Sequence, residues 1–245
     1  MVGAGPAAAA VAASLVAATS SLNAAIDRWQ GGGSVPPAVA RPALTQQKLL
    51  FRLSGDARLE RAVVARLPRT LARDMGDDAL ARRELSRLTV PRRLSAFHVG
   101  RAAGATLLLR WYRQAQRQSG VAWQVLAAVN YVESDFNRLR SNSVSGAQGP
   151  MQFIPSTWRR YGRGDVHDPH AAILAAGRFL RAAGGRVNVR RALYRYNPSS
   201  FYADAVFLYV ARIRRDERAF FAYYSWQLFV RTPSGLRRLT SFGLR

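Results

Sequence analysis

The sequence of 245 residues contains no cysteine. A disulfide framework and a metal site built on thiolates are therefore excluded. Histidine is also scarce: His98 stands alone, and the one close pair, His167 and His170, flanks an Asp-Pro dipeptide. An aspartate before a proline is typical of the start of a helix, so we predict a helix cap at Asp168 and Pro169 and no metal site.

Acidic residues are few. The chain has 14 Asp and Glu against 37 Lys and Arg, a formal net charge of +23, and Lys48 is its single lysine. Such a field attracts polyanions, and nucleic acid is one candidate partner. The arginines are scattered along the whole chain, however, and no recognised nucleic-acid-binding motif accompanies them. We therefore expect no nucleic-acid partner.

No apolar run has both the length and the hydrophobicity of a typical membrane span of about 20 residues. Residues 2–20 are rich in alanine and have the small residues of a signal peptide but lack its basic start. A signal, a membrane tether and a plain Ala-rich helix all stay open. The glycines and prolines of residues 30–42 are typical of a flexible linker. We expect an Ala-rich segment and linker over residues 1–44, with the folded part after it.

Helical periodicity dominates the rest of the chain. In residues 45–88 leucine and alanine recur at intervals of three and four among arginines, which predicts two or three amphipathic helices. Helices are also predicted near residues 107–118 and 121–133, and the length is sufficient to bury a sizeable core. We predict a mostly α-helical protein. Residues 45–104 show no catalytic constellation and form a helical accessory region.

Glu133 follows Leu126 and Val129 at helical spacing, so its carboxyl closes an apolar stripe. Desolvation at such a position raises a carboxyl pKa toward the range of a general acid. Asp135 points elsewhere, which leaves one carboxylate. Most glycosidases use two carboxyl groups, and the exceptions include enzymes in which the substrate's own acetamido group replaces the second carboxyl group. A lone glutamate therefore suggests an N-acetylated sugar as substrate. A surface or satisfied buried acid is the alternative.

A loop rich in serine and glycine follows Glu133, over residues 143–149, and Met151, Phe153 and Trp158 come directly after it. Small side chains and free backbone N–H groups let a bulky ligand approach the main chain closely. The alternative is a solvated loop, followed by core residues of a helix capped near Ser156.

Three stretches together resemble the lytic transglycosylases of the SLT type, which are relatives of goose-type lysozyme. They are Glu133-Ser134, the run SVSGAQGPMQFIPSTW over 143–158, and Tyr196-Asn197. The run is long and ordered, which makes the match specific, and it looks most like versions from actinobacterial exported proteins. The resemblance covers roughly residues 105–215 and implies a lysozyme-like helical catalytic domain there.

The resemblance implies a peptidoglycan lytic transglycosylase without a cofactor. Glu133 would be the catalytic acid that protonates the β-1,4 bridging oxygen between N-acetylmuramic acid and N-acetylglucosamine. The same group would then take the proton of the muramoyl C6 hydroxyl, which closes a 1,6-anhydro ring. The substrate-binding residues that it implies are Ser143 and Ser145 near the acetamido group, Gly146, Met151 as a wall of the cleft, Gln152, Tyr196 as the phenol near the carboxylate, and Asn197.

Pro150 and Pro198 depart from the residues that relatives often have, which affects the expected shape of the subsites. A hydrolytic muramidase of the same fold stays open, as does a non-catalytic basic protein that binds wall or nucleic acid. The expected partners are peptidoglycan strands and anionic wall polymers, for a monomer exported to the cell wall or a periplasm-like space. Residues 216–245 are aromatic, and we favour an extension packed on the catalytic domain over a strand or hairpin that turns at 233–235.

Overall fold

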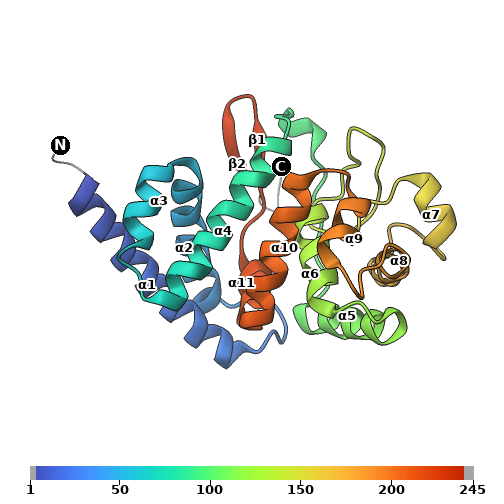
Figure 1. Ribbon diagram of the computed structural model, residues 1–245, viewed down its shortest axis with the longest axis horizontal. Coiled ribbons are helices and arrows are strands. Elements are labelled where there is room, and N and C mark those ends of the chain that lie inside the picture. The colour runs from blue at the N-terminus through green and yellow to red at the C-terminus, as the bar shows by residue number, and fades with distance from the viewer. Residues whose placement is uncertain (1–3, 240–245) are drawn as a thin grey trace.

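Helices make up most of the structure. The computed structural model describes residues 4–239, and in that range it has eleven α-helices, one 3-10 helix and one antiparallel pair of strands (Figure 1). This confirms the mostly α-helical prediction. The elements are α1 (Ala4–Trp29), α2 (Pro37–Gly55), α3 (Ala57–Val64), α4 (Arg69–Leu88), η1 (Leu94–Ala96), α5 (Ala105–Ser119), α6 (Trp123–Ser134), α7 (Pro155–Tyr161), α8 (Pro169–Ala182), α9 (Val189–Tyr196), α10 (Ser200–Arg215), α11 (Arg218–Ser225), β1 (Phe229–Thr232) and β2 (Gly235–Arg238).

Helix α1 packs on the rest of the protein. It lies against α2, α3 and α11, and its Leu15 and Leu22 are fully buried. Gln46 of α2 donates a hydrogen bond of 2.9 Å from Nε2 to the hydroxyl of Thr19. By length and composition alone α1 could cross a membrane, but 44% of its most apolar window is buried inside the protein.

The linker between α1 and α2 is shorter than the sequence predicted. Pro37 is the first residue of α2, and Pro42 lies inside that helix. Proline at a first helical position loses no hydrogen bond, because that N–H has no partner within the helix in any case. Only residues 30–36 connect the two helices. The folded part therefore includes most of the segment expected to precede it, and residues 1–3 lie outside the described range.

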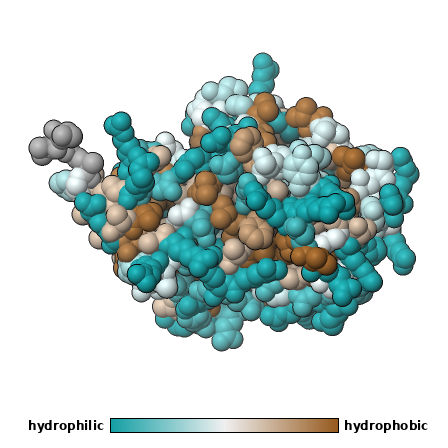
Figure 2. Space-filling view, in the orientation of Figure 1, coloured by the Kyte–Doolittle hydropathy of each residue, from teal (hydrophilic) through white to brown (hydrophobic). Residues whose placement is uncertain are grey.

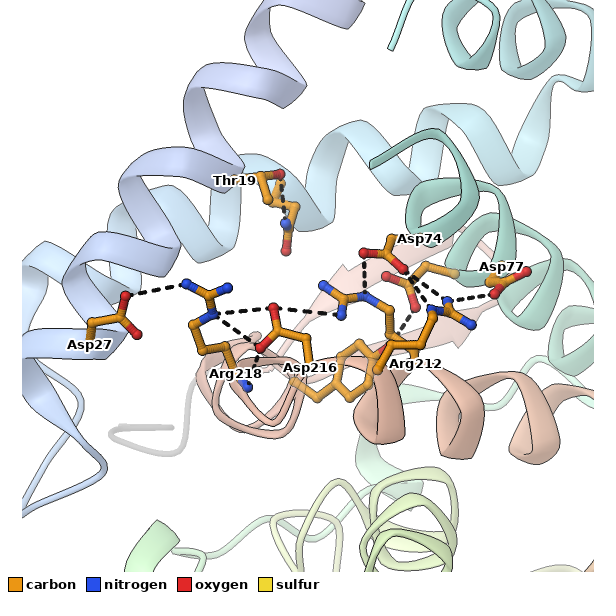
Figure 3. Close-up of polar contacts among 11 residues, drawn as sticks. Thr19, Asp27, Asp74, Asp77, Arg212, Asp216 and Arg218 are labelled. Atoms are coloured by element: carbon orange, nitrogen blue, oxygen red, sulfur yellow. Dashed lines mark hydrogen bonds and ion pairs between the residues drawn. The ribbon is translucent and has the colours of Figure 1, made fainter. Parts of the chain in front are cut away.

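Ion pairs join α4 to α10, as Figure 3 shows. Arg212 of α10 lies 3.3 Å from Asp74 of α4, and Arg215 lies 2.9 Å from the same carboxylate. Tyr223 of α11 donates a hydrogen bond to the buried carboxylate of Asp78. Burial raises the pKa of Asp78 to about 6, although the positive charge of Arg212 acts in the opposite direction. Several of the chain's few acids thus connect the N-terminal helices to the C-terminal half.

Aromatic rings fill the space between α6, α10 and α11. Tyr131 of α6 stacks on Tyr223 at 5.2 Å between ring centroids and meets Tyr209 of α10 edge-on. Phe220 and Tyr223 are three residues apart on a helix, so they share its buried face. The start of the aromatic stretch is therefore helical and covers the core, and the hairpin of β1 and β2 comes after it and turns at 233–234. Residues 240–245 of the expected extension lie outside the described range.

The face seen in Figure 2 is mostly hydrophilic, and its apolar residues form small separate groups. This distribution fits a protein whose hydrophobic residues are largely used in the core between helices.

The ion-pair layer gives a stability prediction. Asp78→Ala leaves the buried hydroxyl of Tyr223 without its hydrogen-bond partner, so we expect the free energy of unfolding to fall by about 1–3 kcal/mol. Asp27→Ala, which removes an exposed partner of Arg218, is expected to cost less than about 1 kcal/mol. Urea unfolding followed by circular dichroism measures both. Equal losses in the two variants would contradict the role given to Asp78.

Candidate active site

Helix α6 ends directly after Glu133. Its last residue is Ser134, and Asp135 leaves the helix in a left-handed conformation with φ 50°. Phe136 and Asn137 also have positive φ, 60° and 69°. Side chains with a Cβ rarely adopt this conformation, so other contacts have to stabilise the turn. One is the hydrogen bond of 2.9 Å that the Asn137 N–H donates to the Ser134 hydroxyl.

The carbonyl oxygen of Pro150 connects the next loop to α6. It accepts a hydrogen bond of 2.6 Å from Ser134 Oγ and one of 2.9 Å from Asn130 Nδ2. Asn130 is held in turn by Tyr112, which donates to its Oδ1 at 2.6 Å. Ser134, Asn130 and Tyr112 are buried. The loop of residues 141–154 therefore has a fixed position relative to the end of α6.

Ser143 organises that loop. Its backbone N–H donates to the Ala147 carbonyl at 3.0 Å, and its hydroxyl accepts from the Ala147 N–H at 2.9 Å and lies 3.0 Å from the hydroxyl of Ser145. Gly149 is required by its surroundings: its φ is +72°, and a Cβ there would lie 2.0 Å from the carbonyl oxygen of Val166. The loop can close on its neighbour only with glycine at this position.

A cleft of about 370 Å³ lies between this loop, the end of α6 and the connection from α9 to α10. Of the residues that the structure describes, Glu133 is the only acidic one that lines it. The cleft brings together five of the seven substrate-binding residues implied by the resemblance. Its lining residues are Glu133, Ser143, Ser145, Ala147, Gln152, Phe153, Ile154, Thr157, Phe179, Arg195, Tyr196, Asn197 and Pro198.

Two residues expected to contact substrate do not line the cleft. The side chain of Met151 is fully buried, so it packs beneath the cleft instead of forming its wall. An apolar side chain gains free energy in that position. Gly146 forms the tight turn of the loop, with φ +79°, and its N–H donates to the Ser143 carbonyl at 3.0 Å. Met151 and Phe153 are both buried, as the alternative interpretation expects, in which the two residues belong to the core.

Glu133 has a tyrosine partner that was not among the residues predicted for the site. Tyr202 of α10 donates a hydrogen bond of 2.5 Å from its hydroxyl to Glu133 Oε1. Tyr196, the tyrosine expected beside the carboxylate, stacks on Tyr202 with parallel rings 6.5 Å apart, while its own hydroxyl donates to the Met151 carbonyl at 2.6 Å. One local feature could have pointed to Tyr202: Ser199 caps α10, which places this tyrosine in the first turn of the helix.

Burial raises the pKa of Glu133 to about 7, and the hydrogen bond from Tyr202 lowers it without cancelling the rise. A carboxyl with this pKa holds its proton part of the time at neutral pH, so it can act as a general acid and then as a general base. The pKa values of Tyr196 and Tyr202 are raised well above the usual range by burial and by the charge of Glu133. Both hydroxyls therefore keep their protons.

Among residues 4–239, no group of three or more His, Cys, Asp or Glu side chains could hold a metal ion. Asp168 caps α8, as predicted, and its Oδ1 accepts from the His170 N–H at 2.7 Å. The ring of His170 stacks on Trp111 and lies 2.9 Å from the amide oxygen of Gln114.

The family model of the transglycosylase SLT domain matches residues 110–203. That span contains α6, the loop after it, Tyr196 and Tyr202. Over these residues, less than half of the chain, the protein is similar to a transglycosylase SLT domain, a helical lysozyme-like fold. The predicted resemblance to the SLT type is confirmed, and the likeness to actinobacterial exported proteins stays a prediction.

Two curated relatives match part of this chain, and both are named membrane-bound lytic murein transglycosylase F. The protein of Thiobacillus denitrificans is 38% identical over 69 residues, which cover 28% of this chain and 14% of the relative. The protein of Alcanivorax borkumensis is 34% identical over 76 residues, 31% of this chain and 16% of the relative. The chain thus spans only a small part of the relatives' length. No solved structure matches it significantly.

The bond between Tyr202 and Glu133 gives a prediction for a titration. Tyr202→Phe removes a hydrogen bond that stabilises the ionised carboxyl, so the pKa of Glu133 should rise above about 7. Carbon NMR of side-chain-labelled glutamate measures it. Tyr161→Phe, which changes a half-buried tyrosine outside the cleft, is the control and should leave the pKa of Glu133 unchanged. A lower pKa in Tyr202→Phe would refute the assignment.

Proposed function

We propose that this protein is a peptidoglycan lytic transglycosylase. The observation that carries the proposal is the single carboxyl of the cleft, Glu133, with its raised pKa of about 7. An enzyme with one carboxyl in the cleft needs a substrate that supplies the second group itself, and an N-acetylated sugar does so. The SLT domain and the names of the two relatives support the same activity.

In the proposed mechanism, protonated Glu133 donates its proton to the oxygen that bridges N-acetylmuramic acid and N-acetylglucosamine, and the bond from C1 to this oxygen breaks. The acetamido oxygen of the muramoyl residue stabilises C1. The Glu133 carboxylate then takes the proton of the C6 hydroxyl, whose oxygen bonds to C1 and closes the 1,6-anhydro ring. Glu133 ends protonated again, and no water is consumed.

The other side chains of the cleft bind and orient the sugar in this proposal. Ser143 and Ser145 present hydroxyls at the position expected for the acetamido group, and Gln152 and Asn197 present amides. Tyr196 offers its ring as a wall. Tyr202 does not line the cleft and acts through the carboxyl that it holds.

The proposed substrate places the enzyme outside the cytoplasm. The relatives are named as membrane-bound, and α1 is apolar enough for a tether, although much of it packs on the protein. We assign the catalytic domain to residues 105–215, with residues 45–104 as an accessory region and residues 216–245 as a C-terminal extension, of which the described part ends at residue 239.

The first test removes the proposed acid. Glu133→Gln keeps the shape of the side chain but has no proton to donate, so we expect a loss in rate of about 10² or more with glycan binding retained. Glu217→Gln, an exposed glutamate paired with Arg113, is the matched control and should keep full activity. The assay is release of soluble fragments from purified sacculi.

Mass spectrometry of the fragments then identifies the reaction. Ends lighter by one water than hydrolysed ends are expected, because the C6 hydroxyl replaces water as the nucleophile. Hydrated ends would identify a muramidase. Unchanged fragment release by Glu133→Gln would contradict the role of Glu133 as the acid, and no release by the wild type would indicate a non-catalytic binding protein.

The pH profile tests the protonation state. The first step needs the protonated form of Glu133, so kcat/KM should fall as pH rises through about 7. In Tyr202→Phe the fall should move to higher pH, in the direction of the altered pKa. A fall that begins near pH 4 to 5, the usual range of a glutamate, would contradict the role of burial.

A further inference from the structure

A second pocket, also of about 370 Å³, lies on the other side of Glu133. Glu133 lines both this pocket and the cleft, so the two hollows meet at the proposed catalytic group. Most residues of the second pocket lie outside the SLT domain, on α2, α4, the segment after α4, and the β1–β2 hairpin. The match to the SLT family therefore assigns it nothing.

Three arginines from three segments line the second pocket: Arg82, Arg92 and Arg231. Arg82 and Ser86 are four residues apart on α4, so they share a face of that helix. Arg231 donates a hydrogen bond of 3.2 Å to the Ser86 carbonyl, which places its guanidinium about one helical turn from Arg82. The backbone N–H of Arg92 bonds to the Arg231 carbonyl at 3.1 Å. Figure 1 shows the hairpin beside α4.

None of these guanidinium groups forms an ion pair with a carboxylate among residues 4–239. Arg92 and Arg231 bond only to backbone carbonyl groups. Arg82 lies over the ring of Phe51, 3.8 Å from its centroid, and its Nε is buried without a hydrogen-bond partner. Two carboxyl groups, those of Glu133 and Asp135, also line the pocket. Asp135 pairs with Arg138, and Glu133 accepts a hydrogen bond from Tyr202, so neither neutralises the three arginines by a direct ion pair. The pocket is therefore suited to a carboxylate, which arginine binds through paired N–H groups.

Apolar side chains complete the pocket. Phe51 and Phe229 meet edge-on at 4.7 Å between ring centroids, and both line it. The chemistry is that of a site for a short peptide with a carboxylate, since apolar side chains and main chain can lie on the rings while the carboxylate meets the arginines.

We propose that the second pocket binds the carboxylate-bearing peptide attached to the glycan strand, while the strand itself lies in the cleft at Glu133. The inference rests on the proposed function, because that function places a peptide-bearing sugar at the point where the two hollows meet. Recognition of this peptide is thus assigned to the accessory helices and the hairpin, and the chemistry of cleavage to the SLT domain.

The test compares two substrates that differ only in the peptide: glycan strands that carry peptides, and the same strands after an amidase has removed them. Arg82→Gln and Arg231→Gln should each reduce kcat/KM on peptide-bearing strands about tenfold, the effect of one lost hydrogen bond to a charged group. Both variants should match the wild type on peptide-free strands. Arg117→Gln, an exposed arginine of α5 that lines neither hollow, removes the same charge and should change neither rate.

Equal losses on both substrates, or no loss in Arg231→Gln, would overturn the proposal. Arg231 is exposed, so this variant is expected to fold even if Arg82→Gln does not, and thermal melting checks both. A third substrate is the same strand with its peptide carboxylates amidated. On this substrate the kcat/KM of the wild type should be about tenfold lower, and Arg231→Gln should not lower it further. A loss only in the presence of phosphate-bearing wall polymer would assign the arginines to that polymer instead.

A direct binding measurement separates this inference from the proposed function. Calorimetry with the full chain should give about tenfold tighter binding of a disaccharide that carries a peptide than of the same disaccharide without it. Arg231→Gln should abolish the difference. If the wild type cleaves no strand, the proposed function fails; if the two disaccharides bind equally, the second pocket is not a peptide site.

Discussion

The geometry of the cleft depends on one carbonyl oxygen, that of Pro150. It accepts hydrogen bonds from Ser134 and Asn130, which are four residues apart on α6 and so share one face of the helix. All three groups are buried, and loss of either donor would leave a buried polar atom without a partner, at a cost of about 1–3 kcal/mol. Glu133 lies between the two donors in sequence. The contacts that fix the loop therefore also fix the direction of the proposed acid.

The sequence predicted the parts of the cleft that lie close together along the chain. Glu133 and the loop up to Gln152 are within twenty residues of each other, so local spacing and the family resemblance were sufficient. The tyrosine partner was harder, because the choice between Tyr196 and Tyr202 depends on how α9 and α10 pack. Met151 was predicted to form a wall of the cleft but packs beneath it. The burial of an apolar side chain depends on tertiary packing, which the local sequence does not report. The packing of α1 depends on distant contacts, which local proline and glycine signals do not report.

The chain has a net charge of +23, and several of its few acidic residues are used in one set of contacts between helices. Asp74, Asp77 and Asp78 of α4 pair with residues of α10 and α11, where they join the two halves of the molecule. Because the chain has only 14 acidic residues, arginines elsewhere have few partners. Arg82 and Arg231 show the consequence, since they line one pocket and neither forms an ion pair with a carboxylate among the described residues. The scarcity of acids is thus consistent with the proposed anion site as well as with a general positive field.

A carboxyl that donates a proton and then accepts one must populate both forms near neutral pH. Burial of Glu133 favours the protonated form, and the hydroxyl of Tyr202 favours the ionised form. The tyrosine keeps its own proton, because its pKa lies well above the usual range. It can therefore donate the same hydrogen bond in both steps and hold the carboxyl in one orientation between them. In the proposed mechanism, the carboxyl then keeps one orientation while it transfers protons at two different oxygens of the sugar.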